Sequence, residues 1–222
     1  MEAYGARYES VFVLLHPFVS VPEQLAWTAT KQYPGDEQIA SLGSKIHWGF
    51  VAAQTGLDTF SRLNHALLTS IRSLKDEFCD FGGARALNAF LESQPVWMPG
   101  EGAFEPLLQM DLLAAFEAAG HRELIFVPEF PLVDPVQTLD VAQLRSGATP
   151  FPHRGSLLAP DASFLFTVDW DSFFTLFYGR GELVSEVVRQ RELEGFLANP
   201  RTEHAWYNYA LGCSVVTVSP EG

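Results

Sequence analysis

The stretch that decides the fold is Phe164-Leu-Phe-Thr-Val-Asp-Trp-Asp-Ser-Phe-Phe-Thr-Leu-Phe-Tyr178. It contains two apolar runs, residues 164–168 and 173–178, divided by Asp169-Trp170-Asp171. Short runs rich in aromatic and β-branched residues and bounded by turn residues are typical of strands. We therefore expect a β-rich core here, made of two neighbouring strands or of one long bent strand.

Outward from this core, helical and strand patterns are interspersed along the chain. Further strands are expected at Ser10–Leu15, 123–127 and 214–218, and helices at Asp36–Leu42, 58–77, 84–91, 104–119 and 182–197. The strongest pattern is residues 58–77, where apolar residues recur at three- and four-residue steps behind Asp58 as the N-cap. Gly82-Gly83 is expected to end that unit, and residues 136–160 are expected to form a long surface loop. Pro128, Pro131 and Pro135 should not pair centrally in a sheet.

The order of these elements predicts the fold class. Regular alternation of strand and helix is missing, which favours α+β, with a mainly antiparallel or mixed sheet packed against several amphipathic helices. The length of 222 residues and the 47% hydrophobic content favour one globular domain over residues 1–222 rather than a disordered chain.

Compartment is inferred from what the sequence lacks. No apolar stretch reaches the ~20 residues that span a bilayer, and the N-terminus lacks the basic leader and cleavage site of a signal peptide. Cys79 and Cys213 are far apart and lie in no Cys-x-x-Cys pattern, so we expect two reduced thiols. These features predict a cytoplasmic protein without membrane contact.

Charge constrains the choice of partner. The chain has 27 acidic and 14 basic residues, a formal net charge of −13. Residues 86–144 contain one base, Arg122, and nine acids: Glu92, Glu101, Glu105, Asp111, Glu117, Glu123, Glu129, Asp134 and Asp140. Nucleic-acid binding requires the opposite sign of charge, so it is not expected. An acidic face suits a basic protein partner, and the alternative is a surface that only keeps the chain soluble.

A few side chains are candidates for catalysis. Asp169 and Asp171 are two residues apart, so in an extended chain both carboxylates face one way and could share a cation or divide acid and base roles. His16 ends a predicted strand and could join them, and Glu101 lies in the loop Trp97-Met-Pro-Gly-Glu-Gly102. The simpler readings are turn carboxylates, a packed histidine and a helix-entry turn. We predict no metal site and no cofactor, because the common ligand and nucleotide motifs are absent.

A second candidate site is Gly179-Arg180-Gly181, between a predicted strand and a predicted helix. Backbone amides, the helix dipole and Arg180 could bind an anion there. A dinucleotide fingerprint fails because Val184 stands where its third glycine would be. The alternative is a tight turn that needs glycine at positive φ.

Several short motifs carry a family resemblance: Leu15-His16-Pro17-Phe18, Tyr33-Pro34, Thr69-Ser70-Ile71, Pro99-Gly100-Glu101-Gly102 and the run from Val168 to Phe177. Taken in order, they resemble a family of uncharacterised bacterial proteins, a domain of unknown function. The resemblance spans most of the chain. It implies a bacterial, single-domain cytoplasmic protein and transfers no catalytic residue.

Three functions are compatible with these features. The first is a small acidic intracellular binding or interaction protein. One version of this function is a protein that neutralises a basic partner protein by binding it. The second is a hydrolase-like enzyme with a polar cleft around Asp169, Asp171, His16 and Glu101. The third is a small-anion or ligand sensor at residues 179–181. Convergence of the four candidate side chains in space would separate the first two.

Overall fold

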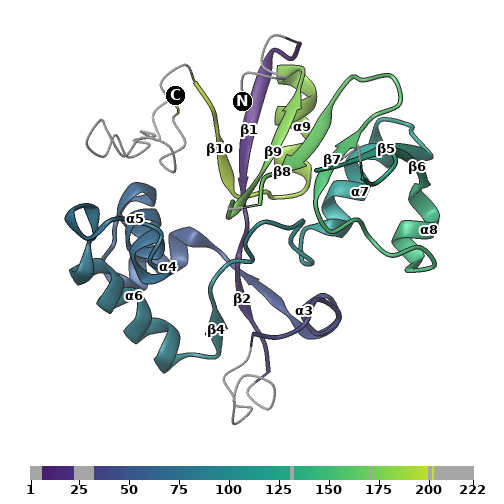
Figure 1. Ribbon diagram of the computed structural model, residues 1–222. Helices are drawn as coiled ribbons and strands as arrows, with labels where there is room; N and C mark the ends of the chain where they lie inside the picture. The colour runs from purple at the N-terminus through teal and green to yellow at the C-terminus, as the bar shows by residue number, and fades with distance from the viewer. Residues whose placement is uncertain (1–6, 23–32, 131–132, 171, 200–201, 203–222) are drawn as a thin grey trace. The chain divides into compact units, whose positions relative to one another are not determined.

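The computed structural model describes residues 7–22, 33–130, 133–170, 172–199 and 202. It divides into two compact units (Figure 1). Unit 1 comprises Met1–His16 and Pro99–Ala198, and unit 2 comprises Pro17–Met98 and Asn199–Gly222. The α+β class with antiparallel sheets is confirmed, whereas the expectation of one domain over residues 1–222 stays a prediction.

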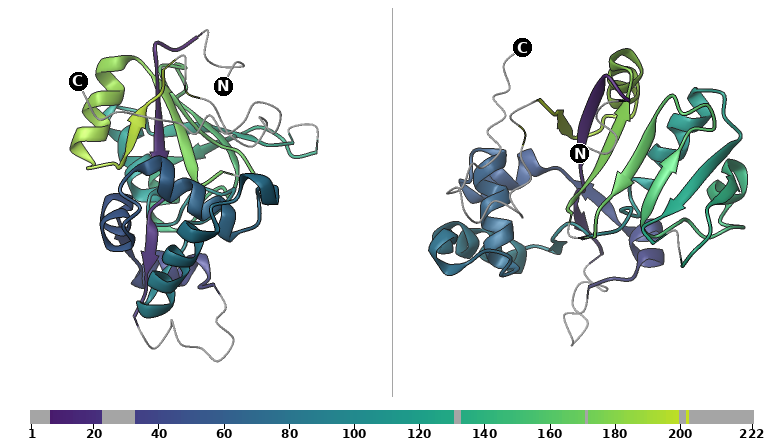
Figure 2. Two further views of the ribbon diagram at one scale, coloured as in Figure 1. Left: turned by 90° about the vertical axis from the view of Figure 1, so that its left-hand side faces the viewer. Right: turned by 45° about the horizontal axis from the view of Figure 1, so that its top comes forward.

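A seven-stranded antiparallel sheet forms the centre of unit 1, with the strand order β10-β1-β9-β8-β7-β5-β6 (Figures 1 and 2). Its strands are β1 (Ser10–Leu15), β5 (Glu123–Pro128), β6 (Gln137–Asp140), β7 (Gly155–Leu158), β8 (Leu165–Val168), β9 (Phe174–Gly179) and β10 (Gly195–Leu197). The two predicted apolar runs are the neighbours β8 and β9, with Phe166 opposite Phe177. This confirms two strands rather than one bent strand.

Three helices pack with this sheet around one core: α7 (Gln109–Ala118), α8 (Val141–Ser146) and α9 (Gly181–Gln190). Alternation along the strands selects the core residues, so Phe12 and Leu14 of β1 join Phe166 and Phe177 there. The Phe166 and Phe177 rings stack with their centroids 4.4 Å apart. Both aromatic side chains come from residues 164–178, the stretch quoted at the start of the sequence analysis.

Unit 2 has a three-stranded antiparallel sheet in the order β3-β2-β4, with helices beside it. The elements are β2 (Phe18–Ser20), α3 (Asp36–Leu42), β3 (Ser44–Ile46), α4 (Trp48–Thr55), α5 (Phe60–Ser70), the 3-10 turn η1 (Asp76–Phe78), α6 (Phe81–Ser93) and β4 (Val96–Trp97). The ring centroids of Phe18 and Trp48 lie 5.3 Å apart. Those of Trp48 and Phe60 lie 5.2 Å apart. These aromatic contacts tie β2, α4 and α5 together.

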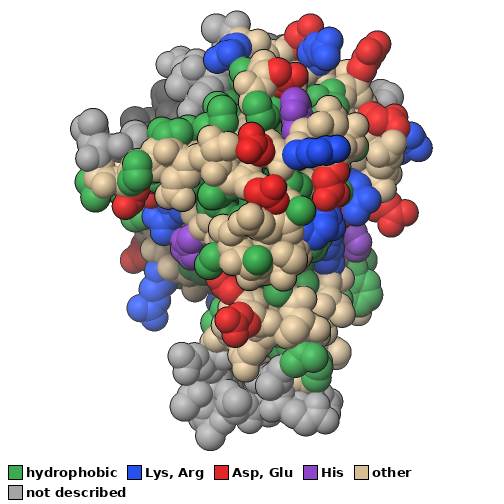
Figure 3. All heavy atoms as spheres, turned by 90° about the vertical axis from the view of Figure 1, so that its right-hand side faces the viewer, with side chains coloured by type: hydrophobic (Ala, Val, Ile, Leu, Met, Phe, Trp, Pro, Cys, Tyr) green, Lys and Arg blue, Asp and Glu red, His purple; other side chains and the backbone are tan. Residues whose placement is uncertain are grey.

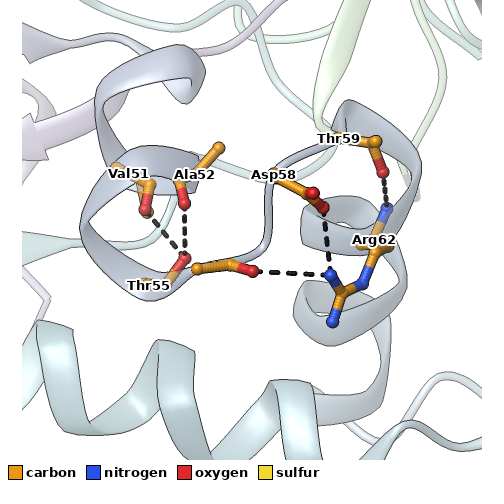
Figure 4. Close-up of polar contacts among 7 residues, drawn as sticks. Val51, Ala52, Thr55, Asp58, Thr59 and Arg62 are labelled. Carbon is orange, nitrogen blue, oxygen red and sulfur yellow. Dashed lines mark hydrogen bonds and ion pairs between the residues drawn. The ribbon is translucent and has the colours of Figure 1, made fainter.

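The helix predicted for residues 58–77 is shorter at both ends. Thr59 is the N-cap, because its hydroxyl accepts the backbone N–H of Arg62 at 3.2 Å, while Asp58 instead bonds the Arg62 guanidinium at 3.0 Å (Figure 4). At the other end Arg72 adopts φ 59°, and the Ser73 amide donates to Leu68 O at 3.0 Å. This is a Schellman motif with arginine in the position that glycine usually occupies. Apolar residues recur at helical spacing beyond this motif, at Leu74 and Phe78, and this is why the sequence predicts a longer helix.

The same motif shortens the predicted helix 182–197. Helix α9 ends at Gln190, Glu192 adopts φ 51°, and the Leu193 amide donates to Val188 O at 3.0 Å. The chain then turns back, and Gly195–Leu197 pairs with β1 as the edge strand β10. Residues 191–197 of the predicted helix are therefore a loop and a strand.

Two further predictions are wrong. Residues 136–160 hold β6, α8 and β7 rather than a long loop, because short elements gain their stability from packing on the sheet rather than from their own sequence pattern. Gly82 and Gly83 lie in the first turn of α6, where Gly83 N donates to the N-cap Asp80 at 2.8 Å. A Cβ on Gly83 would lie 3.1 Å from the Cβ of Ala66, so glycine lets α5 and α6 approach closely. The expected strand 214–218 lies outside the described residues.

Leu67, at the centre of α5, is fully buried. We expect Leu67→Ala to lower the free energy of unfolding by ~2–5 kcal/mol through lost burial and a residual cavity. Arg85→Ala, at an exposed position of α6, is the control. Equilibrium urea unfolding measures both, and a loss below about 0.5 kcal/mol for Leu67→Ala would contradict its place in the core.

Candidate functional site

Three segments that carry the resemblance motifs meet at one end of the unit 1 sheet. They are the end of β1 at His16, the loop at residues 99–105, and the turn between β8 and β9. His16 N donates to Phe173 O at 2.9 Å, and Gly102 N donates to Ser172 O at 2.9 Å. His16 and the turn that contains Asp169 are therefore neighbours, and the loop containing Glu101 adjoins the same turn.

His16 is the buried centre of this arrangement. Its Nδ1 lies 2.8 Å from Gly100 O and its Nε2 lies 3.0 Å from Thr175 Oγ1. Because a carbonyl only accepts, Nδ1 carries the proton, and Nε2 accepts from the Thr175 hydroxyl. Burial lowers the pKa of His16 to about 4, although its bond to Gly100 opposes the shift. At neutral pH the ring is uncharged and links two segments.

The acidic candidates lie around this centre with different exposures. Glu101 and Asp169 are exposed, and Asp171 lies outside the described residues. Glu105, which was expected near the start of a helix at residue 104, is buried, and its Oε2 accepts from Gly100 N at 3.2 Å. The helix begins only at Gln109, so Glu105 holds the loop instead of a helix terminus. Its sequence context resembles that of the exposed acids, so no signal separated it from them.

Gly102 brings the loop and the turn into backbone contact. Its φ is 66°, and a Cβ at this position would lie 1.8 Å from Trp170 O. Ser172 N closes the turn by donating to Asp169 O at 3.1 Å. The Trp170 side chain itself is 58% exposed. A glycine is therefore required under a turn that presents a large aromatic side chain to solvent.

The predicted anion site lies elsewhere in unit 1. Gly179 ends β9 opposite Ser10, so the length of β9, roughly 17 Å, separates it from the His16 end. Arg180 is the exposed N-cap residue of α9, but Glu182 occupies the first turn. Neither glycine has positive φ, so that part of the prediction is wrong: a Cβ would lie 3.2 Å from Val184 at Gly179 and 3.2 Å from Ser10 Oγ at Gly181. Close packing explains both glycines.

The acids of residues 86–144 do not form one uniform face. Asp111 pairs with Arg191 at 3.1 Å, Glu117 with Arg145 at 2.7 Å, and Glu129 with Arg154 at 3.1 Å. The side of Figure 1 where β6 and α8 lie carries acidic and basic side chains interspersed (Figure 3). Arginine side chains therefore hold three of these nine acids, whereas Glu101 is exposed at the His16 end of the sheet.

The described part of the chain contains no group of three or more His, Cys, Asp or Glu side chains placed to hold a metal ion. None of its helices is long and apolar enough to cross a membrane.

The lowered pKa of His16 predicts a pH-dependent stability. The contribution of the neutral His16 ring to the free energy of unfolding is complete above the ordinary histidine pKa of 6.5. It is lost as pH falls toward about 4, because the histidine of the unfolded chain binds a proton at higher pH than the buried one. Between about pH 7 and about pH 5, we expect wild type to lose about 2 kcal/mol more unfolding free energy than His16→Asn. Urea unfolding at both pH values measures this difference, and equal losses in the two proteins would contradict a neutral, buried His16.

Gly102→Ala tests the contact between loop and turn. We expect a loss of at least about 3 kcal/mol in unfolding free energy, from a left-handed alanine and from its clash with the turn. Gly120→Ala is the matched control, because Gly120 has φ 82° but open space around the added Cβ, and it should lose only about 1 kcal/mol. Thermal or urea unfolding measures both variants. An equal loss of unfolding free energy in Gly102→Ala and Gly120→Ala would mean that the turn moves aside for the alanine methyl group.

Comparisons with known proteins agree with the resemblance of the motifs. The uncharacterised protein YwbB of Bacillus subtilis (strain 168) is 26% identical over 216 residues, which cover 93% of this chain and 94% of that protein. No solved structure matches the chain. The model of a family described as protein of unknown function (DUF2711) matches residues 1–208. The chain therefore belongs to the DUF2711 family of proteins of unknown function.

Proposed function

We propose that this protein binds a basic partner through the exposed side chains of Glu101, Asp169 and Trp170, here called the motif surface. The observation that carries this proposal is the set of hydrogen bonds beneath the motif surface. His16 Nδ1 donates to Gly100 O, the Thr175 hydroxyl donates to His16 Nε2, and Gly102 N donates to Ser172 O. These hydrogen bonds fix the loop and the turn that carry the exposed side chains. Loops held on a rigid scaffold are frequent binding elements, because little ordering entropy is then lost on association.

The side chains of the motif surface suit a cation. Glu101 and Asp169 are exposed carboxylates on adjoining segments, and Trp170 is exposed between Asp169 and the buried Ser172. A lysine or arginine side chain gains attraction from the face of a tryptophan and from a nearby carboxylate. The net charge of −13 adds long-range attraction for a basic partner, which speeds association at low salt.

The hydrolase alternative finds less support in the same geometry. The Thr175 hydroxyl and His16 Nε2 form a pair like a nucleophile with its base, at 3.0 Å. However, His16 and Thr175 are 0% and 1% exposed. A substrate would reach them only after the loop and turn had separated. The anion-sensor alternative is disfavoured by the carboxylate of Glu182 in the first turn of α9.

The test uses fluorescein-labelled octalysine as a basic probe, with fluorescence anisotropy as the readout. We expect salt-sensitive binding to wild type and an affinity loss of about tenfold in Asp169→Asn/Trp170→Ala. Asp169→Asn alone separates the charge from the ring. Circular dichroism and urea unfolding verify that each variant is folded.

The matched control is Glu9→Gln, which removes the same charge from an exposed position at the opposite end of the sheet, just before β1 begins. Its affinity should stay within about twofold of wild type. An equal loss in this control would mean that only net charge attracts the probe. Unchanged binding by Asp169→Asn/Trp170→Ala would remove the motif surface from the function.

A further inference from the structure

The edge strand β6 is the second feature of unit 1 that is suited to a partner. It ends the strand order of the seven-stranded sheet, and β5 is its one partner among the strands that the structure describes. Its residues Gln137, Thr138 and Asp140 are exposed. An edge strand offers a row of main-chain donors and acceptors to which another extended segment can add.

The register shows which groups of β6 point outward. Val141 N donates to Arg122 O at 2.9 Å, just beyond the last β5–β6 pair, Glu123 with Asp140. Facing residues of an antiparallel pair alternate between hydrogen-bonded and non-hydrogen-bonded positions. Leu139 and Gln137 are therefore hydrogen-bonded to β5, whereas the N–H and C=O of Thr138 point away from it.

The surroundings of this edge define the chemistry of the segment. Val133 and Val136, just before the strand, are 81% and 54% exposed. Asp134, Glu123 and Asp140 are exposed carboxylates nearby, with Arg122 as the exposed base beside them. Glu123 and Asp140 face each other across the two strands. The edge therefore combines apolar and acidic side chains.

We propose that β6 accepts an extended, basic segment of a partner protein as an additional strand. Thr138 would exchange main-chain hydrogen bonds with the segment. Basic side chains of the segment would lie against the carboxylates and apolar ones against Val136. The inference rests on the proposed function for the charge of the partner, but it names a separate contact. A second copy of this chain fits less well, because it would bring the same carboxylates to the edge.

The experiment removes the outward donor without touching the inner ladder. Proline is tolerated at an outward-facing edge position, so Thr138→Pro should keep the β5–β6 pairing, and Thr138→Ala is its matched control. The probe is a labelled eight-residue peptide of alternating lysine and valine. We expect Thr138→Pro to weaken its binding about tenfold and Thr138→Ala to change it by less than about twofold.

A second measurement needs no variant. Hydrogen exchange at the Thr138 amide of wild type should slow when the alternating peptide is bound, because an added strand takes up that N–H. Unchanged exchange, or equal peptide affinity in Thr138→Pro and Thr138→Ala, overturns the proposal. Sedimentation without peptide gives the last outcome: a dimer that Thr138→Pro dissociates would assign the edge to a second copy and overturn it as well.

The two proposals fail separately. Loss of octalysine binding in Asp169→Asn/Trp170→Ala with no effect of Thr138→Pro on the alternating peptide keeps the motif surface and rejects the edge. The reverse pattern keeps the edge and rejects the motif surface.

Discussion

The candidate surface depends on the two hydrogen bonds of the buried His16 ring. They join Gly100 O to Thr175 Oγ1 and so connect a loop to a strand that lie far apart in the sequence. A buried polar ring is costly unless its nitrogens are satisfied, and here each nitrogen has a partner of the right kind. Glu105 holds the same loop through Gly100 N. The exposed Glu101, Asp169 and Trp170 owe their fixed positions to these bonds beneath them.

The sheet explains why these segments meet. Strand β1 lies between β10 and β9, so its end at His16 adjoins the start of β9 and the turn before it. The whole of residues 17–98 separates β1 in sequence from the other strands of this sheet. Contacts of such sequence separation form late and cooperatively, because the loop-closure entropy comes before the gain from burial. The site is thus a product of the completed sheet rather than of any local motif.

Acidic character is organised by pairing and position rather than by abundance. Three of the nine acids in residues 86–144 form ion pairs, with Arg191, Arg145 and Arg154. A fourth acid, Glu105, is buried. Among the other acids of residues 86–144 in unit 1, Glu101 is exposed at the His16 end of the sheet, and Glu123, Asp134 and Asp140 are exposed at the β6 edge. Both places combine carboxylates with an exposed apolar or aromatic side chain, and the two proposed contacts are argued from this combination.

The sequence by itself determined the apolar strands β1, β5, β8 and β9, the α3 helix and the α+β class, because alternation and turn residues are local signals. It also brought His16, Glu101 and Asp169 forward as candidates, from motif composition alone. The helix ends at Arg72 and Glu192 were hidden, since each places a non-glycine residue in the left-handed region, which the packing around it selects. Likewise the burial of Glu105, the outward Thr138 amide and the contact of Gly102 with Trp170 were decided only by tertiary structure, because each depends on a neighbour distant in sequence.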